Sequence, residues 1–473
     1  MLTLSDSAHQ PLYQQIYEQL KAGILAGDPP AGKRLSSIRA LARELGVGKN
    51  TVTAAYQQLC DEGYIENRPR SGFVVAELEP GFSTPPDGRS PCSGEPLEEP
   101  GNPGWGSQPR YSHDFQYGCL GEGDFPLAAW RRITNQVLSG EGPGEMGEYP
   151  RSKGEPGLRR RLRDYLAASR GVRCRTEQIV MAPGTQWCMN ILCRLLEDRS
   201  VAMEDPGYDG VRHVLTLHGK QLIPIPVGPQ GLDPQALWKS SAQSLYITPS
   251  HQFPTGAVMP IRNRMQILEW AQARDGIIME DDYDSELRYS GRPIPSIQGI
   301  DSHGCVVYLG TVSKAFSPAL RLSYMVLPES LLDKYHTLFS RYASPVPWLE
   351  QRIFETFMEQ GLWERHLRRA CLANGRRHDV LVKSVRETMG DKVRIIGEGA
   401  GLHILLAFQE GTIESQALEK ARAAGIRVYP VHHYYMDRKR YRGNQVLLGF
   451  AGMDRRAIPQ GVARLARAWF DGV

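Results

Sequence analysis

Two segments of the chain pass from an uninterrupted apolar run directly into a polar turn. Gly276–Leu287 (GIIMEDDYDSEL) ends in acidic residues, and Val306–Leu327 (VVYLGTVSKAFSPALRLSYMVL) carries a Ser-Lys pair. Short apolar runs of this kind are typical of strands buried inside a sheet. From about Tyr111 onward strand-like and helix-like segments alternate, which predicts an α/β sheet with helices on both faces.

The polar turns contain residues that suit one cofactor, pyridoxal 5'-phosphate. Lys314 would form a Schiff base with it, and Asp281, at the end of the other apolar run, would keep the pyridine nitrogen protonated. Thr311 and Ser313 before the lysine and Arg321 after it add the hydroxyls and the guanidinium that a phosphate requires.

The acidic run also has a plainer interpretation, because acidic residues after strands are commonly solvated helix caps. Asp281 and Asp282 are not expected to be buried together beside Glu280 at low cost. A pyridinium facing one of them would offset that cost, since an opposite charge favours the ionised carboxylate.

Three further strand-like runs lie at 179–182, 200–203 and 244–248. The first leads into Gly184 and Thr185 at the start of a helical run, where free N–H groups and the positive helix end favour a phosphate. The second leads to Tyr208, whose ring suits stacking on an aromatic cofactor, although simple packing is the commoner role of such a residue. The third enters a rigid loop, 249–256 (PSHQFPTG), which suits the edge of a ring.

The first 77 residues contain the pattern of a helix-turn-helix. Apolar residues at every fourth position predict a first helix that begins at Pro11. A second helix, capped by Ser36 or Ser37, is expected to end at Gly46. A third helix, from about Lys49, would enter the major groove of DNA.

A wing is expected after the third helix, with strands at 63–65 and 72–75 around a turn that contains Arg68, Pro69 and Arg70. Basic residues cluster between Lys33 and Thr53, where phosphate contacts are expected. A lone helix-turn-helix pattern is often only a helical hairpin, but the wing and the local charge favour DNA binding. The candidate DNA-contacting residues are Arg34, Arg39, Lys49, Asn50, Thr51, Thr53, Arg70 and Gly72.

The segment 78–110 carries eight prolines and six glycines, which predicts a flexible tether. The chain of 473 residues is therefore expected to comprise a DNA-binding domain (1–77), this linker and a large domain (111–473). No stretch approaches the roughly 20 apolar residues of a membrane span. We therefore expect no membrane partner. The eight cysteines form no C-x-x-C pair, so we expect a cytoplasmic protein without a metal centre.

The run PAGKRLSSIRALARELGVGKNTVTAAYQQLCDEGYIENRPRSGFVV resembles the winged-helix domain of the GntR family of bacterial transcription regulators. The resemblance covers about Pro11–Val75. It departs from the family at Ser36, where a proline is usual. This departure alters the helix cap and is not expected to abolish DNA binding.

The segments YPRSKGEPGLRRRLRDYLAASRGV (149–172), PSHQFPTG, EDDYDSE and GTVSK resemble the type I aminotransferase fold. That resemblance implies a large α/β domain with a mixed sheet and a small α+β C-terminal domain. The whole chain resembles the MocR branch of GntR-like regulators, which join a winged helix to an aminotransferase-like domain that binds pyridoxal phosphate. Sites of this fold lie at a dimer interface, so the resemblance implies a head-to-tail homodimer.

The resemblance implies a role for each motif residue. Lys314 matches the Schiff-base lysine, Asp281 the partner of the pyridine nitrogen, and Tyr283 the partner of the cofactor's phenolic oxygen. Tyr208 matches the ring-stacking aromatic, and Tyr149 matches the tyrosine that the other subunit donates. The residues that match the phosphate cup are Gly184, Thr185, Thr311, Ser313 and Arg321.

Two positions depart from the aminotransferase pattern. Phe253 stands where aminotransferases have an asparagine that contacts the phenolic oxygen. Leu447 stands where they have the arginine that clamps a substrate carboxylate, and Arg427, Arg440 and Arg442 are nearby alternatives. With leucine at that place, binding of an α-carboxylate is expected to be weak.

Three hypotheses follow. The first is a transcription regulator that binds operator DNA and senses pyridoxal phosphate, or an amine or amino acid that reacts with it. The second is a working aminotransferase with a DNA-binding appendage. The third is a DNA-binding protein whose enzyme-like domain serves only for dimerisation. The retained site residues favour the first hypothesis over the third. We expect a sensor rather than a physiological enzyme, and the sequence leaves open whether the protein keeps some transaminase activity.

Overall fold

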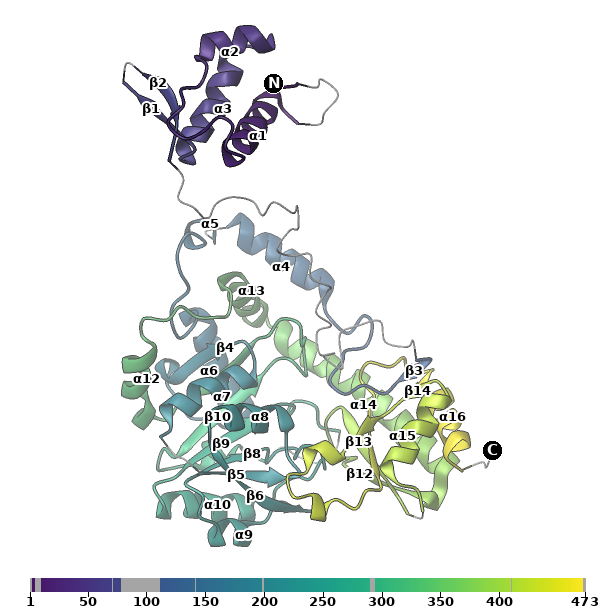
Figure 1. Ribbon diagram of the computed structural model, residues 1–473. Coiled ribbons are helices and arrows are strands. Elements are labelled where there is room, and N and C mark those ends of the chain that lie inside the picture. Colours follow the sequence, from purple (N-terminus) through teal and green to yellow (C-terminus); the bar gives the residue numbers. More distant parts are fainter. Residues whose placement is uncertain are drawn as a thin grey trace. The chain divides into compact units, whose positions relative to one another are not determined.

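The structure is a computed structural model that describes residues 2–4, 10–69, 71–77, 111–140, 142–197, 200–289, 294–409 and 411–470. The chain divides into two compact units, Met1–Gln108 and Pro109–Val473, each of which is described by itself (Figure 1). The expected linker, 78–110, lies outside the described residues, as does Arg70.

The first unit is a winged helix. Its elements are α1 (Leu12–Leu25), α2 (Ile38–Leu45), α3 (Lys49–Asp61), β1 (Ile65–Arg68) and β2 (Gly72–Val75). Ser37 caps α2, because its Oγ accepts a hydrogen bond from the N–H of Ala40 at 3.2 Å. The carbonyl of Ser36 accepts a hydrogen bond from the Tyr56 hydroxyl at 2.9 Å, so the backbone before α2 is held without the proline usual in the family.

The first strand of the wing starts later than expected. Gly63 and Tyr64 complete the turn after α3, since their N–H groups donate to the carbonyls of Cys60 and Leu59. The strand therefore begins at Ile65, and Arg68, which was expected in the turn, pairs with Gly72 at the end of the hairpin. The prediction of a strand at 63–65 was wrong in its position.

The second unit is built around an eight-stranded mixed sheet of order β4-β11-β10-β9-β8-β5-β6-β7. The strands are β4 (Ile179–Ala182), β5 (Ser200–Asp205), β6 (Gln221–Gly228), β7 (Gly231–Leu232), β8 (Ser244–Ile247), β9 (Ile277–Asp282), β10 (Val306–Thr311) and β11 (Ser323–Val326). The central strands β10, β9, β8, β5 and β6 are parallel, and β11 and β7 are antiparallel to their neighbours.

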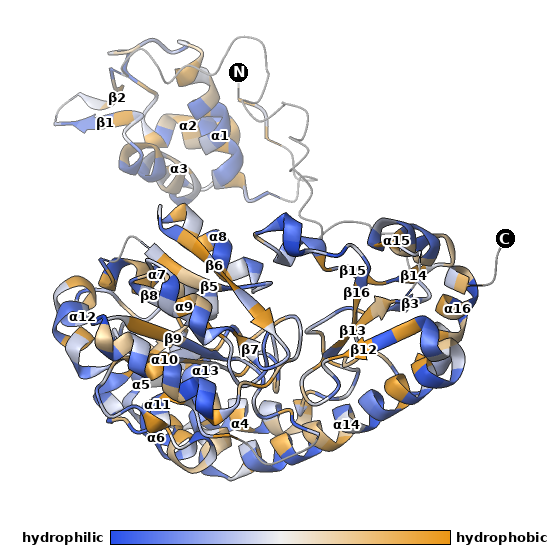
Figure 2. Ribbon diagram, turned by 90° about the horizontal axis from the view of Figure 1, so that it is seen from below, coloured by the Kyte–Doolittle hydropathy of each residue, from blue (hydrophilic) through white to orange (hydrophobic). Residues whose placement is uncertain are grey.

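Helices cover both faces of this sheet, as the alternating pattern predicted (Figure 1). Met279 packs with α7 and α8 on one face, and its neighbour Ile278 packs with α10 on the other. Figure 2 accordingly shows hydrophobic residues concentrated on strands such as β5, β6 and β9. The helices of this part of the unit are α4 (Leu127–Ser139), α5 (Gly142–Glu145), α6 (Pro156–Arg170), α7 (Thr185–Leu195), α8 (Asp209–Leu217), α9 (Pro234–Lys239), α10 (Ile261–Ala273), α11 (Ile297–Ile300), α12 (Leu332–Phe339) and α13 (Trp348–Glu359).

The C-terminal part forms a smaller α+β layer around an antiparallel sheet of order β12-β13-β16-β15. A separate parallel pair joins β14 to β3, from the start of this unit. The elements are β3 (His113–Asp114), α14 (Leu362–Met389), β12 (Val393–Ile396), β13 (His403–Phe408), α15 (Glu414–Ala423), β14 (Ile426–Arg427), β15 (Tyr429–Pro430), β16 (Gln445–Gly449) and α16 (Ile458–Phe470). The fold class predicted from the sequence is confirmed. Within the described residues, no helix combines the length and apolar character needed to cross a membrane.

Candidate functional site

One cavity lies at the carboxyl ends of β4, β5, β8, β9 and β10, which is where ligands bind in open α/β sheets. It brings together nine of the ten residues predicted to bind the cofactor, and these are Gly184, Thr185, Tyr208, Asp281, Tyr283, Thr311, Ser313, Lys314 and Arg321. The lining also contains Tyr117, Gln186, Tyr246, Thr248, Phe253 and Pro318. The tenth residue, Tyr149, is 91% exposed and does not line the cavity of its own chain.

One end of the cavity is built to receive an anion. Helix α7 starts at Thr185, and Gly184 before it has φ +110°, a conformation that glycine adopts readily. Any Cβ at Gly184 would overlap the Arg321 guanidinium, whose Nη2 donates to the carbonyl of Pro183 at 3.2 Å. The helix dipole, the free N–H groups of the first turn and the guanidinium therefore converge there. Arg321 itself has φ +51°, a strained backbone conformation of the kind that recurs at ligand sites.

Hydroxyl groups extend this anion site along β10 and β11. Thr311 Oγ1 lies 3.0 Å from Ser313 Oγ and accepts a hydrogen bond from Ser323 Oγ at 2.7 Å. The N–H of Ser313 also donates to Thr311 Oγ1, at 3.2 Å. This chain of hydroxyls fixes Thr311 and Ser313, which line the same cavity as Arg321.

Asp281 presents one unpaired oxygen. Its Oδ2 accepts a hydrogen bond from the Tyr246 hydroxyl at 2.6 Å, while its buried Oδ1 has no partner among the described residues. Burial raises the pKa of Asp281 to about 7, although the Tyr246 hydrogen bond acts in the opposite direction. A buried acceptor without a partner is costly, so this oxygen marks a place for a hydrogen-bond donor or a cation.

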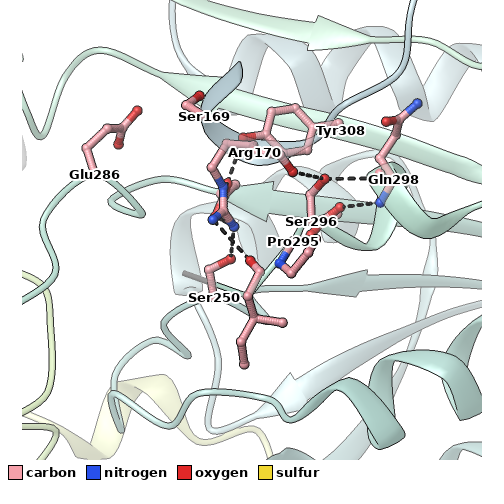
Figure 3. A network of polar contacts seen from close by, with 12 residues as sticks. Ser169, Arg170, Ser250, Glu286, Pro295, Ser296, Gln298 and Tyr308 are labelled. Atoms are coloured by element: carbon pink, nitrogen blue, oxygen red, sulfur yellow. Dashed lines mark hydrogen bonds and ion pairs between the residues drawn. The ribbon is translucent and has the colours of Figure 1, made fainter. Parts of the chain in front are cut away.

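The acidic run around Asp281 is buried throughout, contrary to expectation, because each carboxylate has its own partners. Glu280 accepts hydrogen bonds from the N–H groups of Ile297 and Gln298, at 2.8 and 2.9 Å. Asp282 forms a buried ion pair with Arg170 at 2.6 Å and accepts from the Tyr308 hydroxyl at 2.6 Å. The arginine also bonds Ser250, as Figure 3 shows. Burial by itself raises the pKa of Asp282, but the Arg170 guanidinium and the hydrogen bonds to the carboxylate together lower it.

Tyr308 and Tyr246 each donate a hydrogen bond to one of two neighbouring carboxylates, so their phenylalanine variants form a matched pair. Tyr308→Phe removes one of the hydrogen bonds to Asp282, so the free energy of unfolding should fall by roughly 1–2 kcal/mol. Ligand binding should not change, since Tyr308 lies outside the cavity lining. Tyr246→Phe removes the hydrogen bond to Asp281 and should raise the pKa of Asp281 further, weakening binding of a cationic ring. Denaturant unfolding and ligand titration of both variants test these expectations. If the two variants changed ligand binding equally, the separate roles of Tyr246 and Tyr308 would be contradicted.

Lys314 is the amine of the cavity. Its Nζ lies 4.1 Å from the centre of the Tyr117 ring, and a Cβ at Gly118 would come within 2.6 Å of it. Burial lowers the pKa of Lys314, and the nearby Arg321 adds to the effect. A lowered pKa increases the fraction of neutral amine, which is the nucleophilic form.

Tyr283 is held by a buried histidine. Its hydroxyl lies 3.1 Å from His251 Nδ1, and the same nitrogen lies 2.8 Å from Asp284 Oδ2. Since the shorter contact to a carboxylate requires Nδ1 to be the donor, the Tyr283 proton is left free to point into the cavity. Gly401 closes over this group, because a Cβ there would overlap the His251 ring.

The two departures noted in the sequence lie together. Phe253 lines the cavity, and Leu447 is buried in the same apolar cluster as Phe253 and Tyr283. Arg440 and Arg442 line a different cavity, between β6 and β12. Arg427 lies beside the rings of Tyr111 and Tyr429. Of the three alternative arginines, none contributes to the described lining of the first cavity.

Sequence reasoning missed Tyr117 and Tyr246. Tyr246 sits on β8, opposite Met279 of β9, so only the pairing of the two strands brings its hydroxyl to Asp281. Tyr117 comes from a segment before the first strand of the large sheet and belongs to no motif. The only indication of Tyr246 in the sequence was its position near the end of a strand-like run, and nothing in the sequence indicated Tyr117.

The candidate DNA contacts form a separate surface on the winged helix. Arg39, Lys49, Asn50 and Thr53 are exposed, although Thr53 Oγ1 donates to the carbonyl of Lys49 at 2.9 Å. Arg34 precedes α2 and lies against the wing, because its guanidinium would be 3.6 Å from a Cβ at Gly72. Thr51, at the first turn of α3, is partly buried.

Comparisons with known proteins match both units. Residues 12–75 match the family model of bacterial regulatory proteins, gntR family, and residues 119–464 match that of aminotransferase class I and II. The chain is 37% identical to the HTH-type transcriptional regulator YdeL of Bacillus subtilis, with 97% of each chain covered. It is 33% identical to the probable rhizopine catabolism regulatory protein MocR of Rhizobium meliloti, over 99% of this chain and 96% of that protein.

Solved aminotransferases share the fold of the second unit. The kynurenine aminotransferase of Pyrococcus horikoshii superposes with a TM-score of 0.70 at 24% identity, over 76% of this chain and 91% of that one. An archaeal alanine:glyoxylate aminotransferase gives a TM-score of 0.71 at 22% identity, over 78% of this chain and 92% of that one.

Proposed function

Because the chain belongs to the GntR family of bacterial regulators, in the MocR branch that carries an aminotransferase class I and II domain, we propose that its second unit binds pyridoxal 5'-phosphate and controls binding of operator DNA. The signal is pyridoxal phosphate itself or an amino compound that reacts with it. The observation that carries the proposal is the unpartnered Asp281 Oδ1 in a cavity that also holds Lys314 and an anion site.

The residues of the cavity fit this cofactor. The anion site at Gly184, Thr185 and Arg321 suits its phosphate, and Asp281 Oδ1 suits a protonated ring nitrogen. When bound, pyridoxal phosphate supplies an aldehyde and a ring that withdraws electrons. Lys314 would hold the cofactor covalently, because its Nζ is an amine that can condense with an aldehyde with loss of one water. Tyr283 would offer its free hydroxyl proton to the cofactor's phenolic oxygen, and Tyr208 would pack on the ring.

The winged helix is the reader of double-stranded operator DNA. Arg34 and Arg39 contact phosphates, and Asn50 and Thr53 at the exposed side of α3 set the sequence preference. Lys49, Thr51, Gly72 and Arg70 complete the proposed contact set. Arg70 lies outside the described residues.

Replacing Arg39 tests the phosphate role. In Arg39→Ala the slope of log affinity against log salt should fall by about one unit, because one released counterion is lost. The loss of affinity should be similar for every duplex sequence. Arg467→Ala, which removes an exposed arginine of the second unit, is the control. Fluorescence anisotropy of labelled duplex across a salt series makes the measurement, and an unchanged slope in Arg39→Ala would refute the contact.

A head-to-tail homodimer in the cytoplasm is part of the proposal. The ring of Tyr149 is 91% exposed, which leaves it available to the cavity of a second copy. A working aminotransferase with a DNA-binding appendage is not favoured, because the relatives that match nearly all of this chain, including the winged helix, are regulators. Absorbance spectra of the purified protein with added pyridoxal phosphate test the proposal. We expect a cofactor band that borohydride shifts to shorter wavelength, because reduction of the C=N bond leaves the cofactor attached to the protein as a secondary amine. The absence of the band would overturn the proposal.

A further inference from the structure

Aromatic residues form one wall of the cavity, and these are Tyr117, Tyr208, Phe253 and Tyr283. The ring centroid of Phe253 lies 5.2 Å from that of Tyr117 and 5.9 Å from that of Tyr208, and Tyr434, outside the described lining, packs on Phe253 at 4.8 Å. The ring of Tyr283 lies 6.3 Å from Phe253 and completes the wall. These edge-to-face and tilted contacts make a preformed apolar surface next to the Lys314 amine.

Each charged side chain that lines the cavity already has a role in the proposed cofactor site. Among the described lining residues the cations are Lys314 and Arg321, and the anion is Asp281. Arg321 lies against the Gly184 turn, within the anion site. Asp281 faces the place of the ring nitrogen. The described lining thus offers no further cation for a carboxylate carried by an effector.

Leu447 occupies the position at which the resemblance to aminotransferases would place such a cation. It lies on β16 between Leu405 of β13 and Tyr429 of β15, and it is 1% exposed. It belongs to the same apolar cluster as Phe253 and Tyr283, two residues of the aromatic wall, and is not itself among the described lining residues. Arginines on nearby segments have other partners: Arg212 donates to the carbonyl of His433, and Arg440 pairs with Asp437 at 3.3 Å.

We infer that the effector of this protein is a primary amine with an uncharged remainder, bearing no carboxylate on the carbon that carries the nitrogen. This inference rests on the proposed function. The effector nitrogen replaces Lys314 Nζ in the C=N bond to the cofactor, and Lys314 leaves as the free amine. The remainder then packs on the aromatic wall, where an apolar or hydroxylated group is favoured and an unpaired carboxylate is strongly disfavoured.

Matched pairs of amino acids and their decarboxylated amines test the inference in the full-length protein. Suitable pairs are L-phenylalanine and 2-phenylethylamine, L-leucine and 3-methylbutylamine, and L-serine and ethanolamine. The cofactor absorbance is recorded first, and each compound is then titrated against it. In at least one pair the amine should bind at least ~30-fold more tightly than the amino acid, and in no pair should the order be reversed.

The outcomes separate this inference from the proposed function. No cofactor band at the start would overturn both. A cofactor band with equal or tighter binding of the amino acids, or with no response to any of the six compounds, would overturn the inference and leave cofactor binding in place.

Variants at Leu447 test the residue itself. Leu447→Arg should shift the preference toward the amino acids by at least ~10-fold, because the new guanidinium pairs with the carboxylate. Leu447→Met keeps the volume and the apolar character and should change the preference by less than ~2-fold. If Leu447→Arg does not fold, as judged by thermal unfolding, the wild-type series still decides. A folded Leu447→Arg with an unchanged preference would overturn the role of Leu447.

Discussion

Lys314→Ala is expected to abolish the borohydride-trapped bond between the protein and pyridoxal phosphate. Among the described residues that line the cavity, Lys314 supplies the only amine that could bind the aldehyde covalently, so the loss should be complete rather than graded. The cofactor should still enter weakly, because the anion site and Asp281 remain. Peptide mass spectrometry after reduction locates the bond, and absorbance follows the residual binding.

Lys153 is the matched control for this experiment. It is 8% exposed, and burial lowers its pKa as well. It differs from Lys314 in its surroundings, since its Nζ donates to the carbonyl of Glu177 at 2.8 Å and lies 3.0 Å from His336 Nε2. Lys153→Met should therefore keep the trapped bond at Lys314. A bond that persists in Lys314→Ala, or that maps to Lys153 in the wild type, would contradict the assignment.

Asp281→Asn is expected to weaken cofactor binding and to stabilise the cofactor-free protein. The amide keeps an acceptor for Tyr246 but removes the charge that holds a pyridinium, so affinity should fall at least ~100-fold. Equilibrium dialysis or absorbance titration with pyridoxal phosphate measures the loss. An affinity within a factor of ~3 of wild type would show that Asp281 does not face the ring nitrogen.

The stability effect of Asp281→Asn depends on pH. The pKa of Asp281 is raised to about 7 in the folded protein by burial, against ~3.9 in an unfolded chain. A carboxyl with a raised pKa contributes stability that is present below about pH 4 and is lost as the pH rises through about 7. At pH 8 the wild type carries a buried, partly paired charge, and the variant should be more stable by up to ~4 kcal/mol. At pH 4 the two should unfold alike, and a constant difference from pH 4 to pH 8 would contradict the raised pKa.

Much of the fold could be predicted because its signals are local. An apolar run followed by a polar turn marks a strand end wherever it occurs, and Asp281, Lys314 and Gly184 were placed in this way. The helix ends of the winged helix were marked by Ser37 and Gly46. The start of β1 was misplaced because Gly63 and Tyr64 belong to the turn that closes α3, which depends on hydrogen bonds to Cys60 and Leu59.

The partners of the buried carboxylates could not be predicted, because they come from distant parts of the chain. Arg170, at the end of α6, reaches Asp282 on β9, and His251 reaches Asp284. Isolated acids in the sequence gave no indication of these pairs, so burial of the whole run was unexpected. Tyr246 and Tyr117 were missed for the same reason. The roles given to the site residues, and the homodimer that Tyr149 implies, stay predictions.

The most direct measurement is the affinity of the full-length protein for a DNA duplex that it has selected from a random pool. Fluorescence anisotropy of that duplex is recorded with and without pyridoxal phosphate, and then with an amine that shifts the cofactor absorbance. Wild type and Lys314→Ala should bind the duplex with similar affinity without ligands, because the winged helix is a separate unit. Only the wild type should change its affinity when ligands are added, since a ligand shifts an equilibrium only through different affinity for its states. An equal response in both proteins, or no response in the wild type, would contradict control of DNA binding through Lys314.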